Sequence, residues 1–177
     1  MTRIIALSDT HMERGLPERL VELAEGADFI LHAGDFVSKE VYDSLADLGR
    51  VEAVCGNSDS PELKMLLPER KVIDVDGVKI GLVHRASHSS GPGTELLARE
   101  MEVDVLVYGH LHRPIVERGN KLLICPGSPT VPRMSPPTVA EIEIKDGKVI
   151  GRIVPVGEPT CDYIRYAQSL EKNSHKK

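Results

Sequence analysis

The sequence predicts an α/β fold in which a parallel sheet with crossover helices packs against a second, mixed sheet. In the first half, three apolar runs over residues 3–7, 28–32 and 51–55 each lead into a polar cluster and then a helical pattern. Strands that alternate with helices in this way are typical of a parallel sheet. In the second half, apolar runs are joined by Asp-Gly and Gly-Asn turns, which favour hairpins.

The helices of the first half are predicted from periodicity and from their ends. Residues 16–24 carry leucines at helical spacing. Ser38 suits the N-cap of a helix over 39–48, because its hydroxyl can accept a bond from a free backbone N–H. Ser60, followed by a proline at the first helical position, marks a third helix start.

The second half contains shorter elements. We predict strands at 71–75 paired with 78–83, at 103–108, at 115–116 paired with 122–124, and at 139–144 paired with 149–154. A helix over 94–101 is expected to turn Leu96, Leu97 and Met101 inward. Residues 125–137 are rich in Pro, Gly and Ser and are predicted to be irregular.

The chain of 177 residues is long enough for one full core, and we predict a single domain over residues 1–170. This domain would end in a helix over 160–170. A polar tail over 171–177 is expected to fray.

Composition excludes several classes of protein. The net charge is −5 and no dense Lys/Arg stripe precedes the last residues, which argues against a dedicated nucleic-acid surface. No apolar stretch approaches the ~20 residues that span a membrane. The first apolar run is too short for a signal peptide, and three cysteines suggest no disulfide framework. A cytoplasmic protein is therefore expected, and the sequence leaves open whether it is a monomer or a homodimer.

Seven polar residues follow the predicted strands, and they are the candidate site. In order they are Asp9, His11, Asp35, Asn57, His84, His110 and His112. Ligands of α/β sheets bind beyond the carboxyl ends of the strands, so these side chains can converge there. In an extended segment His110 and His112 would point the same way and could serve two neighbouring ions. Seven donors are too many for one ion and fit two.

The combination of these motifs is similar to a known family. The pattern D-x-H, G-D, G-N-x-D, a lone His and G-H-x-H, in this order, resembles the calcineurin-like metallophosphoesterase superfamily. The short chain and the hairpin before His84 resemble its small bacterial and archaeal phosphodiesterase branch, which is related in fold to the retromer scaffold subunit. The resemblance covers residues 1 to about 154. It implies a four-layer α/β/β/α fold, a two-sheet sandwich with helices on both outer faces.

The resemblance also implies an activity and a cofactor. It implies a phosphodiesterase that acts on a small phosphodiester through two divalent ions, by in-line attack of a metal-bridging hydroxide. Mn²⁺ is the first choice for these ions, with Ni²⁺, Fe or Zn²⁺ as alternatives. Carried over by residue, the first ion would be held by Asp9, His11 and His112, and the second by Asn57, His84 and His110. Asp35 would bridge the two ions and hold the nucleophile, with Asn57 beside it.

The substrate side departs from the family pattern. Many members carry a histidine after the motif asparagine, where this chain has Ser58, a poor acid at neutral pH. We therefore expect weak activity on monoesters and better activity on diesters. Arg85 could grip a phosphate oxygen, or His88 could replace the missing acid, although both also suit an ordinary loop.

Other polar residues near the site have structural interpretations. His32 is expected to support the ligands from a packed position, and Asp59 to cap the helix that follows it. The segment 126–137 could line the site or simply cross between the sheets. Two other functions stay open: a non-catalytic metal-binding scaffold for protein–protein interaction, and a small nuclease.

Overall fold

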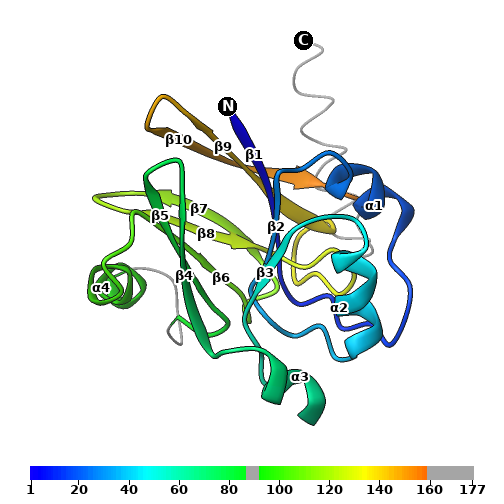
Figure 1. Ribbon diagram of the computed structural model, residues 1–177. Coiled ribbons are helices and arrows are strands. Elements are labelled where there is room, and N and C mark those ends of the chain that lie inside the picture. Colours follow the sequence, from blue (N-terminus) through cyan, green and yellow to red (C-terminus); the bar gives the residue numbers. More distant parts are fainter. Residues whose placement is uncertain (87–91, 159–177) are drawn as a thin grey trace.

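The computed structural model describes residues 1–86 and 92–158, which form two five-stranded sheets packed face to face (Figure 1). The first sheet has the strand order β10-β9-β1-β2-β3. Its strands are β1 (Thr2–Leu7), β2 (Phe29–His32), β3 (Val51–Ala53), β9 (Thr138–Lys145) and β10 (Lys148–Pro155). As predicted, β1, β2 and β3 are parallel.

The final hairpin does not lie where the sequence placed it. Strands β9 and β10 were expected in the second sheet, but β9 pairs with β1 in antiparallel register. The first sheet is therefore mixed. The physical reason is burial. Alternate residues of β9, such as Ile142 and Ile144, enter the core between the sheets, and Val139 enters the outer core. Both faces of β9 are therefore buried, and the position beside β1 covers both of them.

The second sheet is mixed, as predicted, with the order β4-β5-β6-β8-β7. Its strands are β4 (Arg70–Val75), β5 (Val78–Val83), β6 (Val105–Tyr108), β7 (Pro114–Arg118) and β8 (Leu122–Pro126). Strands β5, β6 and β8 are parallel, and β4 and β7 complete hairpins at the two edges. Both predicted hairpins of this sheet are thus confirmed.

Helices cover the outer faces of both sheets, which gives the four-layer arrangement (Figure 1). The four helices of the described part are α1 (Glu18–Ala24), α2 (Lys39–Ala46), α3 (Pro61–Leu66) and α4 (Pro92–Glu100). Leu20, Leu45 and Leu63 bring the first three helices onto the outer face of the first sheet. Leu97 packs α4 on the second sheet, whereas Leu96 is 57% exposed, so its predicted inward position is wrong.

The predicted helix starts are confirmed by side-chain bonds. Ser38 accepts a hydrogen bond from the backbone N–H of Val41, and Ser60 accepts one from Leu63. Each bond satisfies a donor that the first turn of a helix leaves free.

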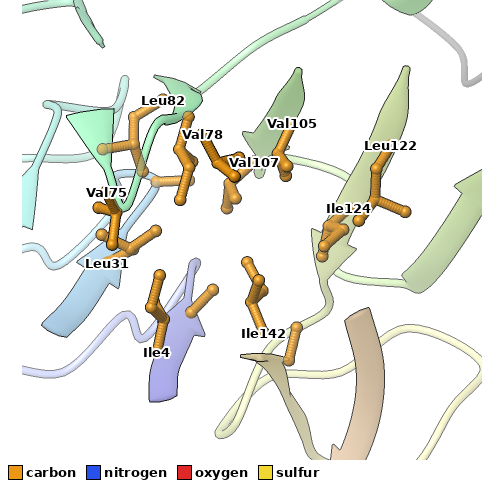
Figure 2. Close-up of a cluster of buried hydrophobic side chains, with 14 of the residues drawn as sticks. Ile4, Leu31, Val75, Val78, Leu82, Val105, Val107, Leu122, Ile124 and Ile142 are labelled. Atoms are coloured by element: carbon orange, nitrogen blue, oxygen red, sulfur yellow. The ribbon is translucent and has the colours of Figure 1, made fainter. Parts of the chain in front are cut away.

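The main core lies between the two sheets. Figure 2 shows Ile4, Leu31 and Ile142 of the first sheet facing Leu82 and Val107 of the second. Burial of these aliphatic side chains is the main force that holds the sheets together, and it fixes their relative position.

This packing brings five strand ends to one edge. Leu7, His32 and Ala53 end β1, β2 and β3 in one row of the register. Val83 and Tyr108 end β5 and β6 in a second row. Within residues 1–86 and 92–158, no helix is both long and apolar enough to cross a lipid bilayer.

Candidate metal centre

All seven predicted ligand residues follow these strand ends within five positions. Asp9 and His11 follow β1, Asp35 follows β2 and Asn57 follows β3. His84 follows β5, and His110 and His112 follow β6. The first sheet thus supplies mainly oxygen donors, and the second supplies imidazoles.

The loops after β1 and β2 are joined by their backbones. The N–H of Asp9 donates to Gly34 O, and the N–H of His11 donates to Asp35 O, each at 3.0 Å. A third bond, from Met12 to Phe36, continues the pairing. These bonds make one rigid unit of the segments that carry Asp9, His11 and Asp35.

The first donor cluster consists of Asp9, His11 and His112. His112 Nε2 lies 3.3 Å from His11 Nε2 and 3.4 Å from Asp9 Oδ1. The two imidazole rings are stacked with their centroids 4.9 Å apart. These three residues form one of two groups in the described part whose donor atoms all lie within 4.8 Å of one another.

The second cluster is centred on Asp35 and His84. His84 Nε2 lies 3.4 Å from Asp35 Oδ2 and 3.1 Å from Asn57 Oδ1. Asp9 belongs to this second group as well as to the first. Asp35 Oδ2 is also 3.4 Å from His11 Nε2, so this one oxygen faces an imidazole from each cluster. The two clusters are therefore continuous through their carboxylates.

His110 lies beside these clusters and outside both groups. Its ring centroid is 5.3 Å from that of His84, and its Nε2 accepts a hydrogen bond from Arg85 Nη2 at 2.9 Å. Burial, followed by the nearby Arg85 guanidinium, lowers the pKa of His110. Its backbone N–H donates to both oxygens of Asp9 and so fixes that carboxylate.

The hydrogen bonds of the rings indicate that these donors suit a cation. Nδ1 of His84 donates to Ala33 O and Nδ1 of His112 donates to Val131 O, each at 2.8 Å. In a neutral ring this leaves the Nε2 lone pair facing further acceptors, Asn57 Oδ1 for His84 and Asp9 Oδ1 for His112. Acceptors that converge on one another repel unless a cation lies between them. Mixed imidazole and oxygen donors of this kind fit a divalent transition metal.

The burial of the two carboxylates also indicates a cation site. Asp9 and Asp35 are at most 1% exposed. Burial raises the pKa of the Asp9 carboxyl, and the nearby Asp35 carboxylate adds to this effect, although the bond from Ser8 and the imidazoles of His112 and His84 act in the opposite direction. Buried carboxylates are costly unless paired, and a divalent cation would provide the compensating charge.

The backbone at the ligands is unusual. Asp9, His11, Asp35, His110 and His112 all have positive φ, between 42° and 72°. The expected extended geometry of His110 and His112 is therefore wrong. Asp and His tolerate this left-handed region better than most side chains, yet each such residue still costs free energy. Such strain gathers at functional sites because only a tightly packed surrounding can maintain it.

Asp59 has a different role from the predicted one. It does not cap α3, since Ser60 does so. Its buried carboxylate accepts backbone N–H bonds from Asp35 and Gly56 at Oδ2 and from Val37 at Oδ1. It therefore holds the Asp35 loop against the turn after β3. The sequence signal for this, an acid two residues after a strand-end asparagine, does not distinguish the two roles.

His32 lies beneath the ligands, as predicted. It is fully buried and stacks on Phe36, with ring centroids 3.5 Å apart. Its Nδ1 accepts from the N–H of Gly34, and its Nε2 lies 3.2 Å from the Thr10 hydroxyl. It thereby fixes the turns that carry both carboxylates.

The irregular segment after β8 supports the site as well as crossing between the sheets. The Ser128 hydroxyl donates to Asp9 O at 2.7 Å, and Ser8 donates back to Gly127 O. The carbonyl of Val131 accepts from His112 Nδ1. The alternative in which this segment lines the site is thus the one that its contacts favour, a detail that its Pro, Gly and Ser content could not reveal.

The three residues predicted on the substrate side lie in different places. Ser58 donates its N–H to Asp35 Oδ1 at 2.8 Å and its hydroxyl to Oδ2 at 3.0 Å. Arg85 is exposed and contacts His110, as described above. His88, like the predicted helix 160–170 and the tail 171–177, lies outside the described residues.

A pocket of about 460 Å³ adjoins the centre on the side of Asn57 and His84. Its rim includes Arg85 and residues of α3 and β4. A volume of this size is typical of sites for small molecules. A substrate bound at the donor clusters could therefore extend into it.

Comparison with known proteins agrees with this geometry. Residues 2–147 match the family model of the calcineurin-like phosphoesterase superfamily domain. The chain is 36% identical to a probable metallophosphoesterase of Methanocaldococcus jannaschii over 159 residues, which cover 86% of this chain and 80% of that protein. It is 33% identical over 166 residues to a probable metallophosphoesterase of Methanothermobacter thermautotrophicus, covering 90% and 96%.

A solved structure shares the fold. Vacuolar protein sorting 29 of Cryptosporidium parvum superposes with a TM-score of 0.71 at 26% identity, covering 86% of this chain and 96% of that one. Because the family model spans residues 2–147 and the two relatives are each matched over 80% or more of their length, the protein belongs to the calcineurin-like phosphoesterase superfamily.

Proposed function

We propose that this protein is a phosphodiesterase that uses two divalent cations to hydrolyse a small phosphodiester. The observation that carries the proposal is the position of Asp35 Oδ2, 3.4 Å from Nε2 of both His11 and His84. A carboxylate oxygen between two imidazoles is suitably placed to bridge two cations. Asp9, His11 and His112 would hold one ion, and Asn57, His84 and His110 the other. Mn²⁺ is the first candidate, with Ni²⁺, Fe or Zn²⁺ as alternatives.

When bound, two such ions would supply a hydroxide near neutral pH and stabilise the negative charge that develops on the phosphoryl oxygens. In the overall hydrolysis the oxygen of water becomes bonded to phosphorus, one phosphorus–oxygen ester bond breaks, and the alcohol leaves with a proton. The role of the chain is to hold the donors in place beforehand. The bonds from Ser58 to Asp35 and from His110 N–H to Asp9 do this for the two carboxylates.

The bonding of Ser58 supports a preference for diesters. Its hydroxyl proton is directed to Asp35 Oδ2, so it does not point to a leaving group. A serine hydroxyl is in any case a weak acid at neutral pH. A diester with an acidic alcohol needs little protonation as it departs, whereas a monoester with a basic alcohol needs much. We therefore expect faster turnover of activated diesters.

The test starts from metal-stripped protein. Bis-p-nitrophenyl phosphate and p-nitrophenyl phosphate are assayed with Mn²⁺, Ni²⁺, Mg²⁺ or Zn²⁺ added back, and the diester is expected to turn over faster. Asp35→Asn should lower kcat/KM on the order of 100-fold or more. Asp47→Asn, at an exposed helix end, removes the same charge and should change nothing. Ser58→His should shift the ratio of rates towards the monoester.

The results separate the alternatives. Absence of metal-dependent turnover with either ester, while Asp35-dependent metal binding persists, would favour the non-catalytic scaffold. Rapid cleavage of long single-stranded DNA or RNA together with slow cleavage of small diesters would favour the nuclease.

A further inference from the structure

The pocket beside the centre shares two walls with it. Asn57 and His84 line the pocket, and both belong to the second donor cluster. Val83 and Cys55 form part of its apolar wall. Burial raises the pKa of the Cys55 thiol, so this side chain stays neutral. A diester whose phosphorus lies at the centre would place one of its two arms in this space.

The rim of the pocket is cationic although the chain is acidic overall. Lys64, Arg70 and Arg85 line it, against a single carboxylate, Glu69. Lys64 donates to Asn57 O and Arg85 donates to His110, which turns both cations towards the centre. Within residues 1–86 and 92–158, none of the three is in an ion pair with a carboxylate. The whole chain carries a net charge of −5, so this rim is a local reversal.

A larger hollow of about 770 Å³ lies between α4 and the β7-β8 hairpin, and its rim also carries two cations, Arg99 and Arg118. Arg99 is paired with Glu95 at 2.8 Å, and none of the described residues that line this hollow belongs to the donor clusters. Of these two hollows, the first is the one whose described lining combines cations outside any ion pair with residues of the donor clusters. Among the described residues that line it, the one aromatic ring is the imidazole of His84, which belongs to the second donor cluster, so little ring surface remains on which a nucleobase could stack. Recognition there must depend on charge more than on base identity.

Building on the proposed function, we propose that this pocket binds a second phosphate group of the substrate. The preferred substrate is then a phosphodiester that carries a further phosphate on the arm lying between α3 and the ends of β4 and β5. Guanidinium groups suit this role because their fork of N–H donors matches phosphate oxygens. Two anionic groups would be bound together, the scissile phosphate at the donor clusters and the second phosphate at Arg70 and its neighbours.

The test compares matched dinucleotides. With the metal-loaded protein, kcat/KM is measured for thymidylyl-thymidine and for the same dinucleotide with a 5′- or 3′-terminal phosphate. At least one phosphorylated form is expected to react about tenfold faster than the plain dinucleotide. Arg70→Gln should reduce that advantage about threefold, the effect of one exposed ion pair, and should lower turnover of bis-p-nitrophenyl phosphate, which has no second phosphate, by less than that of the phosphorylated dinucleotide. Lys145→Gln, at the far end of β9, removes a similar charge as a control.

A binding measurement keeps this inference separate from the proposed function. Thymidine 3′,5′-bisphosphate and thymidine 5′-monophosphate are titrated by calorimetry into the Mn²⁺-loaded protein. The bisphosphate should bind more tightly, and Arg70→Gln should reduce the difference about threefold, because Lys64 and Arg85 remain on the rim. Equal binding of the two ligands, or equal kcat/KM for all three dinucleotides, would overturn the second-phosphate pocket. Lack of turnover of every ester would remove the proposed function, while the binding comparison would still decide the pocket.

Discussion

The buried carboxylate of Asp59 allows the support of the centre to be tested apart from the ligands themselves. The change is Asp59→Asn, which keeps the shape of the side chain. Asp59 Oδ2 accepts from Gly56 N at 2.7 Å and Asp35 N at 3.2 Å, and Oδ1 accepts from Val37 N at 2.8 Å. An asparagine can keep its oxygen towards the first two donors. Its amide N–H₂ must then face the N–H of Val37, donor against donor.

The expected loss of stability follows from the number of hydrogen bonds that each variant loses. One charge-assisted bond is lost and one buried donor is left without a partner, which together cost about 2–3 kcal/mol in free energy of unfolding. Asp59→Ala would leave all three donors unpaired and should cost more, about 4 kcal/mol. Both variants loosen the loop that carries Asp35, so affinity for Mn²⁺ should fall about 10–100-fold, the usual effect of losing a group that orients a ligand.

Urea unfolding of metal-free protein in EDTA gives the stability, and calorimetric titration with Mn²⁺ gives the affinity. Glu62→Gln, an exposed acid in the first turn of α3, serves as the control for charge alone. If Asp59→Asn unfolds at the same urea concentration as the parent and binds Mn²⁺ equally well, the argument that Asp59 positions the loop is wrong.

Three further predictions concern the same region. Gly109→Ala would place a Cβ 2.9 Å from Ser8 Cβ and 3.0 Å from Ala33 O, so it should cost about 1–3 kcal/mol in urea unfolding and weaken Mn²⁺ binding. Burial, followed by the charges of neighbouring histidines, lowers the pKa of His32 well below 6.5, so the folded form resists protonation. Its contribution to stability is complete above pH 6.5 and decreases by about 1.4 kcal/mol per unit as pH falls below that value, until the folded pKa is reached. The urea midpoint of metal-free His32→Gln should therefore vary less between pH 7 and 5 than that of the parent. Finally, EDTA should lower Tm, and Mn²⁺ at 100 times its Kd should restore about 2.7 kcal/mol in the parent but not in Asp35→Asn.

The sequence could predict most of the architecture because the signals for it are local. Periodicity and capping residues located the four described helices, and Asp76-Gly77 located a hairpin. The sheet that receives the last hairpin was predicted wrongly, because alternation of side chains shows which faces are buried but not which strand is adjacent. The position of Leu96 failed for a similar reason. Two adjacent leucines of a helix cannot both face the core, and only the fold decides between them.

The residues of the site likewise include some that the sequence could predict and some that it could not. Residues that follow strands could be grouped from the order of the motifs, since parallel strands end at one edge. The roles of Asp59 and Val131 could not be predicted from the sequence, because each acts through contacts with segments far away in the chain. A carboxylate that accepts three backbone N–H groups looks, in sequence, the same as one that caps a helix.

The backbone strain at the centre connects these two kinds of residue. Val37 has a φ of 84°, which is unfavourable for a β-branched side chain, and it is held there from both sides. Its N–H donates to Asp59, and its carbonyl accepts from the N–H of Ser60, the residue that caps α3. The start of a helix and a buried carboxylate thus stabilise a strained turn two residues beyond Asp35. Loss of either bond would allow Val37 to relax, and Asp35 would turn with it. Metal binding is therefore expected to depend on residues that never touch the ions, and most strongly on those whose bonds maintain this strained conformation.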